Sequence, residues 1–263
     1  GISGAGLASS LSVIFAVFLL FYYFKIAEKY VSVDLSLWKI NVPRIKKLLA
    51  IGLPAGGEFF LMFIYMAAIY WLIKPFGAVA QAAFGLGSRV MQALFLPAMA
   101  IAFAAPAIAG QNFGAKAYDR IRELYTKALL FGSSFMAIAG IIIFFGAEFF
   151  VSLFTDNQEA VVSGAIYLKV AALIGPIYPV FFITTAVFQA VKKPLYSLYL
   201  SILRLTAFPF LSLWYVINIR GGDYEDIFYT IMATNWAMGI VVLIFIGYFL
   251  NNVFKQNKPL FSY

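Results

Sequence analysis

The sequence has no cysteine and no histidine, and only 11% of its 263 residues are charged. These absences exclude disulfides, thiol nucleophiles, imidazole bases and the usual zinc or copper ligand sets, so we expect neither an enzyme nor a bound cofactor. Apolar residues are abundant instead, since 63% of the chain is hydrophobic and 19% is aromatic. Soluble domains do not have this composition, and we therefore expect an integral membrane protein whose partner is the lipid bilayer.

Seven apolar runs are long enough to cross the hydrocarbon core of a bilayer, which takes about 20 helical residues. The runs show no alternation of apolar and polar residues, so they predict an all-α polytopic helix bundle. The predicted spans are Ile2–Phe24, Leu48–Ile73, Ala78–Ala109, Leu124–Phe150, Ala160–Ala190, Leu195–Ile217 and Ile227–Leu250.

Basic residues are concentrated in alternate connections between these spans. The stretches 25–47, 116–127, 192–193 and 255–258 hold six, four, two and two of the 19 lysines and arginines. Cytoplasmic loops carry such an excess, so we expect Gly1 outside and Tyr263 in the cytoplasm. An odd number of spans with an external start also favours a missing helical half before Gly1. No basic stripe is left over for nucleic acid.

Glu58 is the only acidic residue well inside one of the spans. A charge at the bilayer centre raises the free energy of insertion by about 2.5–3.5 kcal/mol, so such a residue indicates an ion or substrate pathway. Glu58, Met62, Tyr65 and Ile69 recur at helical spacing and share one face, on which an organic cation would meet a carboxylate, a thioether and a phenol. The alternative is that Glu58 snorkels or caps helical amides while Met62 and Tyr65 only pack.

A second polar stripe lies in the third span. Gln81, Gly85, Ser88 and Gln92 recur at the same helical spacing. Small and polar side chains in this arrangement either hold two helices together or line a cleft, and the sequence leaves both open.

Two arginines also lie within the spans. Arg89, next to the stripe, either pairs with Glu58 across the bundle or snorkels outward. Arg204 lies near the middle of the sixth span, which contains no acidic residue. We expect it to find a partner on another helix or to face a water-filled cleft, with snorkelling as the alternative.

Prolines and caps predict where the helices bend and begin. Pro176 and Pro179 free backbone carbonyls in the fifth span and predict a bend suited to gating. Asp156 and Glu159 have the spacing of a capping box that would open this span, and Pro194 is predicted to begin the sixth.

Three short motifs lie at the ends of the spans. They are Gly52-Leu53-Pro54-Ala55-Gly56 opening the second span, Gly110-Gln111-Asn112-Phe113-Gly114-Ala115-Lys116 closing the third, and Leu153-Phe154-Thr155-Asp156 before the fifth. The second motif lacks the spacing of a nucleotide-binding loop, and we expect its Gly114 to end a helix in left-handed backbone. In this order and at these distances the motifs resemble the multidrug and toxic compound extrusion (MATE) family, and the similarity covers essentially the whole chain.

The resemblance implies two bundles of six helices joined by a cytoplasmic loop. Residues 1–24 correspond to the last helix of the first lobe, 25–47 to the interlobe linker and 48–263 to the second six-helix lobe. The mixture of apolar and basic residues in 25–47 suits an amphipathic segment at the membrane surface. The implied partner is the missing N-terminal lobe of the same transporter, and the implied location is a bacterial inner (plasma) membrane.

The resemblance also implies the mechanism, which is alternating access. An organic cation or other xenobiotic leaves through a cleft between the lobes while Na⁺ or H⁺ moves inward and occupies acidic sites. Two positions that often carry a carboxylate in the family are Met62 and, by approximate alignment, Tyr178 in this sequence. Either Glu58 takes over ion coupling in this half or the missing first lobe carries it.

Two alternatives remain open. A lipid-linked oligosaccharide flippase would favour a basic cleft, for which Arg89, Arg204 and Lys169 are the candidate cations. The other alternative is a membrane fragment that does not transport. An intramembrane hydrolase is not expected, because the spans contain neither a paired aspartate nor a serine with a base.

Overall fold

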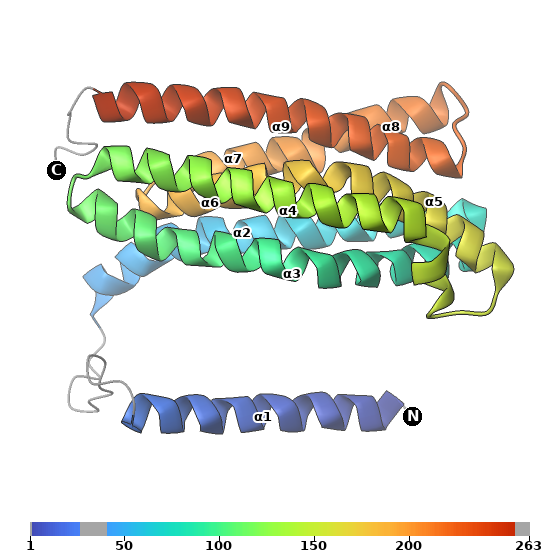
Figure 1. The fold of residues 1–263 in the computed structure, drawn as a ribbon, viewed down its shortest axis with the longest axis horizontal. Helices are drawn as coiled ribbons and strands as arrows, with labels where there is room; N and C mark the ends of the chain where they lie inside the picture. Colours follow the sequence, from blue (N-terminus) through green and yellow to red (C-terminus); the bar gives the residue numbers. More distant parts are fainter. Residues whose placement is uncertain (1, 27–40, 256–263) are drawn as a thin grey trace. The chain divides into compact units, whose positions relative to one another are not determined.

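The computed structural model describes residues 2–26 and 41–255. The chain divides into two units, Gly1–Lys46 and Lys47–Tyr263. The first unit contains α1 (Ile2–Ile26), and the second contains the helix bundle (Figure 1). The amphipathic segment expected in 25–47 falls mostly on residues 27–40, which lie outside the described part of the chain.

Seven helices in the described part are long and apolar enough to cross a membrane, and six of them form the second unit. The predicted all-helical bundle of about seven spans is confirmed. Within the second unit the long helices run side by side (Figure 1). Their bounds are α2 Val42–Ile73, α3 Ala78–Gly114, α4 Tyr118–Ser152, α5 Gln158–Ile174, α6 Tyr178–Ala190, α7 Pro194–Ile202, α8 Phe208–Asn218 and α9 Tyr224–Lys255.

Two of these spans are interrupted. Between α5 and α6 the backbone tightens to a 3₁₀ turn over Gly175–Ile177, where Pro176 is one of the first residues. Between α7 and α8 it widens to a π turn over Leu203–Ala207, which ends two residues before Pro209. A proline ring clashes with the carbonyl four residues earlier and has no N–H to give it, so the helix must change its pitch at both places. The fifth span, α5 with α6, is the most buried of the bundle.

The helix ends confirm one sequence prediction and correct two. Pro194 begins α7, as expected. The capping box at Asp156 is wrong, because Asn157 is the N-cap of α5 and its Oδ1 accepts a hydrogen bond from the Ala160 N–H at 3.1 Å. Asparagine competes well with aspartate for this position. Gly114 was expected in left-handed backbone, but α3 continues through it and the left-handed residue is Lys116 (φ 57°).

Lys192, in the turn between α6 and α7, also has left-handed backbone, with φ 59°. Residues other than glycine adopt this conformation uncommonly, at a free-energy cost of about 1–2 kcal/mol. Both left-handed lysines follow the last turn of a helix and lie in short connections at the same end of the bundle (Figure 1).

An aromatic cluster forms the centre of one end of the core. Phe84 of α3 is 2% exposed and packs edge-on against Tyr70 of α2 and Tyr167 of α5, with ring centroids 5.0 and 4.8 Å apart. It also stacks on Phe228 of α9 at 6.0 Å. One side chain therefore ties together four helices through ring pairs, each of which adds about 0.5–1.5 kcal/mol beyond the area it buries.

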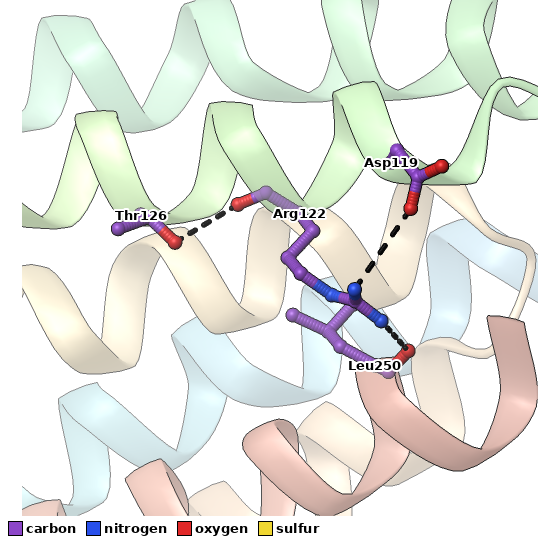
Figure 2. A network of polar contacts seen from close by, with 4 residues as sticks. All are labelled: Asp119, Arg122, Thr126 and Leu250. Carbon is purple, nitrogen blue, oxygen red and sulfur yellow. Dashed lines mark hydrogen bonds and ion pairs between the residues drawn. The ribbon is translucent and has the colours of Figure 1, made fainter. Parts of the chain in front are cut away.

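A side-chain hydrogen bond links α4 and α9 at the opposite end of the bundle (Figure 2). The Arg122 Nη2 donates a hydrogen bond to the Leu250 carbonyl oxygen at 3.1 Å. Its Nη1 lies 3.8 Å from Asp119 Oδ1, but the Asp119 side chain is fully exposed, so this ion pair contributes little. The hydrogen bond across the two helices is therefore the main contribution of Arg122 to holding the bundle closed at this end.

We expect Gly140→Ala to destabilise the bundle by about 1–3 kcal/mol. A Cβ atom at this position of α4 would lie 2.7 Å from the Ala172 carbonyl oxygen of α5, which is backbone and cannot rotate away. Small residues allow the backbones of two membrane helices to approach each other closely. Thermal unfolding in detergent measures the loss. Gly247→Ala on α9 is the control, because nothing lies within 4 Å of its added Cβ, and equal melting of the two variants would contradict the prediction.

Candidate functional site

Glu58 lies close to the middle of α2, which runs from Val42 to Ile73, and its side chain is half-buried. Its Oε2 accepts a hydrogen bond from the Thr185 hydroxyl of α6 at 3.2 Å. Its Oε1 is buried and has no hydrogen-bond partner among the described residues. A buried carboxylate oxygen without a partner raises the free energy of the folded state, so it needs an explanation.

A cavity of about 120 Å³ lies beside this carboxylate, between α2, α3 and α6. Apolar residues supply most of its wall, among them two methionines and three phenylalanines, and Glu58, Thr185 and Gln189 are its polar members. Met62 is one helical turn after Glu58 and lines the same cavity, as the sequence spacing led us to expect. The cavity therefore combines one negative charge with polarizable apolar surface, which is the chemistry that attracts a cation with some apolar character.

Tyr65, on the same face of α2, lines a different cavity of about 320 Å³ between α2 and α8. Trp71, Phe210 and Trp214 are among its other lining residues. The Tyr65 hydroxyl is buried and has no hydrogen-bond partner in the described part of the chain. The stripe that begins at Glu58 is thus divided between two cavities, because different helices pack against the two halves of α2.

The polar stripe on α3 lines a third recess, an open groove of about 670 Å³. Gln81 Nε2 donates to the Tyr70 carbonyl oxygen at 2.9 Å, and the Ser88 hydroxyl contacts the Tyr167 hydroxyl at 3.4 Å. Gln92 is exposed in the groove. Two members of the stripe therefore hold helices together while all four line a groove, so the two interpretations of the sequence hold side by side.

The buried arginine is Arg204, which lies on the π turn and is 7% exposed. Its guanidinium carbon is 4.2 Å from the centre of the Phe181 ring. Arg204 also borders a small polar cavity that it shares with Thr185, Ser197 and Ser201. It therefore faces groups on other helices, and it does not snorkel.

The ion pairs among the described residues join Arg122 to Asp119, Lys127 to Glu123, and Lys169 to Glu148. Glu58 is in none of them, so it is not locked against an arginine. Arg89 is exposed in the groove on α3, and no ion pair joins it to Glu58. Within the same part of the chain, no group of three acidic, histidine or cysteine side chains is placed to hold a metal ion.

The two prolines of the predicted gating bend lie at the join of α5 and α6. Pro176 falls in the 3₁₀ turn, and Pro179 follows at the start of α6, where it is buried. A Cβ atom on Gly132 of α4 would lie 3.2 Å from the Pro179 ring, so α4 packs closely on this join. The change in helix geometry is where the sequence placed it, and its role in gating stays a prediction.

The hydroxyl groups near Glu58 were missed by the sequence reasoning. Thr185 is its hydrogen-bond donor, and Ser197 and Ser201 line the small polar cavity that Thr185 also borders. A signal for two of them was present, because Ser197, Ser201 and Arg204 recur at spacings of four and three and so share one helical face. Nothing in the sequence indicates that this face meets α2.

Comparison with known proteins agrees with this arrangement. The sequence model of the MatE family matches residues 54–213. The chain is 28% identical over 222 residues to the "Probable multidrug resistance protein YpnP" of Bacillus subtilis (strain 168), covering 81% of this chain and 48% of that protein. It is 26% identical over 179 residues to the "Probable multidrug resistance protein NorM" of Pasteurella multocida (strain Pm70), covering 66% of this chain and 38% of that protein.

The fold is shared with a solved structure described as the outward-facing conformation of a multidrug resistance MATE family transporter of the MOP superfamily. The TM-score is 0.86 at 20% identity, and the match covers 98% of this chain and 58% of that one. The chain thus spans about half the length of the proteins it matches. The family model matches most of the bundle, and the helices are arranged as in that structure. The chain therefore belongs to the MATE family of transporters.

Proposed function

We propose that this chain supplies the second lobe of a two-lobe multidrug transporter that exports organic cations in exchange for Na⁺ or H⁺. The observation that carries the proposal is the half-buried Glu58 carboxylate, which keeps one oxygen without a partner beside a cavity lined with thioether and aromatic groups. An intramembrane ionisable residue that faces a cavity indicates an ion or substrate pathway.

The volume of the cavity limits what it holds. Sites for drug-sized ligands measure about 300–1,000 Å³, and the cavity beside Glu58 measures about 120 Å³. It fits a bare or partly hydrated ion, or the cationic end of a larger molecule. We infer that the rest of the substrate site comes from the missing N-terminal lobe, and that the isolated chain has half of the route.

The orientation follows from the basic connections. We infer that the connections at 116–127 and 192–193 face the cytoplasm of a bacterial inner membrane, which puts Gly1 outside and Tyr263 inside. In this orientation Glu58, near the middle of α2, lies near the bilayer midplane. Substrate and ion sites of secondary transporters typically lie at this depth.

A lipid-linked oligosaccharide flippase is less well supported by the side chains. Of the three cations that this alternative would use, Lys169 lies 3.7 Å from Glu148 and Arg204 is buried. Only Arg89 is exposed in an open groove. Arginine binds phosphate groups through paired, charge-assisted hydrogen bonds, and a pyrophosphate has two phosphates to satisfy. A single arginine is therefore a weak site for it.

The proposal is tested by measuring ethidium efflux from cells that lack their own exporters. We expect efflux from cells that express the two-lobe protein containing this chain, and none above background from cells that express the 263-residue chain at equal membrane levels. An anionic dye of similar size should not be exported by either. Efflux by the chain alone, or equal export of the two dyes, would contradict the proposal.

A further inference from the structure

Arg204 is the one buried charged residue with a nearly inaccessible side chain in the described bundle, and such a group needs a counter-charge. Its contact with the Phe181 ring supplies attraction but no negative charge. Among the described residues, the one negatively charged group that acts on the guanidinium is the carboxylate of Glu58, although the two are not in direct contact as an ion pair.

Thr185 connects the two charged groups. Its hydroxyl donates to Glu58 Oε2 at 3.2 Å, and its side chain lines both the cavity beside Glu58 and the small cavity beside Arg204. The small cavity measures about 10 Å³, which is room for one water at most. Thr184, Ser197 and Ser201 supply its other hydroxyls. Hydroxyls both donate and accept, so they can relay polarisation from a guanidinium to a carboxylate.

The π turn places Arg204 on this cavity. Ser197, Ser201 and Arg204 lie at spacings of four and three on one helical face, and the turn that begins at Leu203 widens the helix as it leads into Pro209. Such π turns in otherwise α-helical segments are frequent at functional sites. Arg204 therefore borders the same hydroxyl-lined space as Thr185, which is the hydrogen-bond donor to Glu58.

We propose that Arg204 is the resident counter-charge of Glu58, acting through Thr185 and the hydroxyl-lined cavity. The empty site is then close to neutral, and an arriving cation competes with the fixed guanidinium for the carboxylate. Arg204 thereby lowers the affinity of the lobe for its cargo and favours release. This competition rests on the proposed function, whereas the pairing of the two residues does not.

The pairing is tested by a double-mutant cycle on the purified chain in detergent. We expect Glu58→Gln and Arg204→Met each to lower the melting temperature by about 5–10 °C, since each leaves one charge without its partner. The double variant should recover at least half of the summed loss. Additive losses would overturn the proposal. The control is Arg89→Met, which should combine additively with Glu58→Gln because Arg89 lies in the groove on α3.

Folding failure of a single variant is also informative. If Arg204→Met gives no folded protein, recovery of folded protein by the double variant supports the pairing, and lack of recovery overturns it. Arg204→Lys keeps the charge and should melt closer to the native chain than Arg204→Met does.

The competition is tested by binding of tetraphenylphosphonium to the purified two-lobe protein that contains this chain, because the chain alone holds only part of the proposed substrate site. We expect the Arg204→Met variant of that protein to bind this cation about tenfold more tightly than the native protein, because the carboxylate loses its fixed competitor. Unchanged or weaker binding would overturn the competition. If Glu58→Gln leaves binding unchanged while the melting temperatures remain coupled, the proposed function of Glu58 fails and the pairing stands. The two proposals are therefore separable.

Discussion

Glu58→Gln in the proposed two-lobe transporter is expected to reduce efflux of cationic dyes at least tenfold per molecule of folded protein. The substitution keeps the size of the side chain and removes its negative charge. A hydrogen-bonded or paired charge in a protein contributes about 1.5–3 kcal/mol, which corresponds to about a tenfold to hundredfold change in binding. The cavity holds no second acidic side chain among its lining residues, so none of those residues replaces the charge. Initial rates of ethidium efflux, normalised to protein in the membrane, measure the effect.

The matched control is Glu148→Gln, which makes the same chemical change elsewhere in the bundle. Glu148 lies near the end of α4, 3.7 Å from Lys169, and its side chain is 66% exposed. An exposed ion pair of this kind contributes little, so efflux should stay near the native rate. Equal efflux by the native protein and the Glu58→Gln variant would remove Glu58 from the mechanism.

Phe84→Ala should be the most destabilising single substitution considered, with a loss of about 3–5 kcal/mol. The ring is 2% exposed and contacts rings on α2, α5 and α9. Alanine leaves a cavity that the surrounding helices fill only in part. Packing is also a main source of association between helices in lipid, where apolar surface gains nothing by leaving an apolar solvent. Thermal unfolding in detergent, followed by intrinsic fluorescence, gives the difference.

Phe145→Ala is the control for this prediction. Phe145 lies on α4 and is 83% exposed, so its removal takes away little packing within the bundle. We expect its melting temperature to stay within about 2 °C of the native value. A Phe84→Ala variant that melts together with this control would show that the aromatic cluster does not hold the four helices together.

The helical spans could be predicted from the sequence because lipid permits few alternatives. A long apolar run must satisfy its backbone internally, so each run indicates a helix without any knowledge of its neighbours. The ends of the helices were harder to predict, because neighbouring residues compete for the same capping or left-handed position. Asn157 rather than Asp156 caps α5, and Lys116 rather than Gly114 takes the left-handed backbone. In both cases the predicted residue lay within two positions of the observed one.

The site was predictable only along single helices. The spacing of Glu58 and Met62 correctly placed both on one cavity, because a helical face is a local property. The same reasoning put Tyr65 with them, but another pair of helices packs there and Tyr65 lines a separate cavity. Thr185 was missed for the same reason, since its meeting with Glu58 depends on how α6 packs against α2.

The two left-handed lysines have a consequence for engineering of the bundle. Replacing both Lys116 and Lys192 with glycine would relieve backbone strain at the two turns. The same replacement would delete positive charge from two of the four basic connections, and these charges orient a polytopic chain as it inserts. A glycine that stabilises these turns therefore acts against correct insertion into the membrane. Engineering of the two loops should keep both lysines.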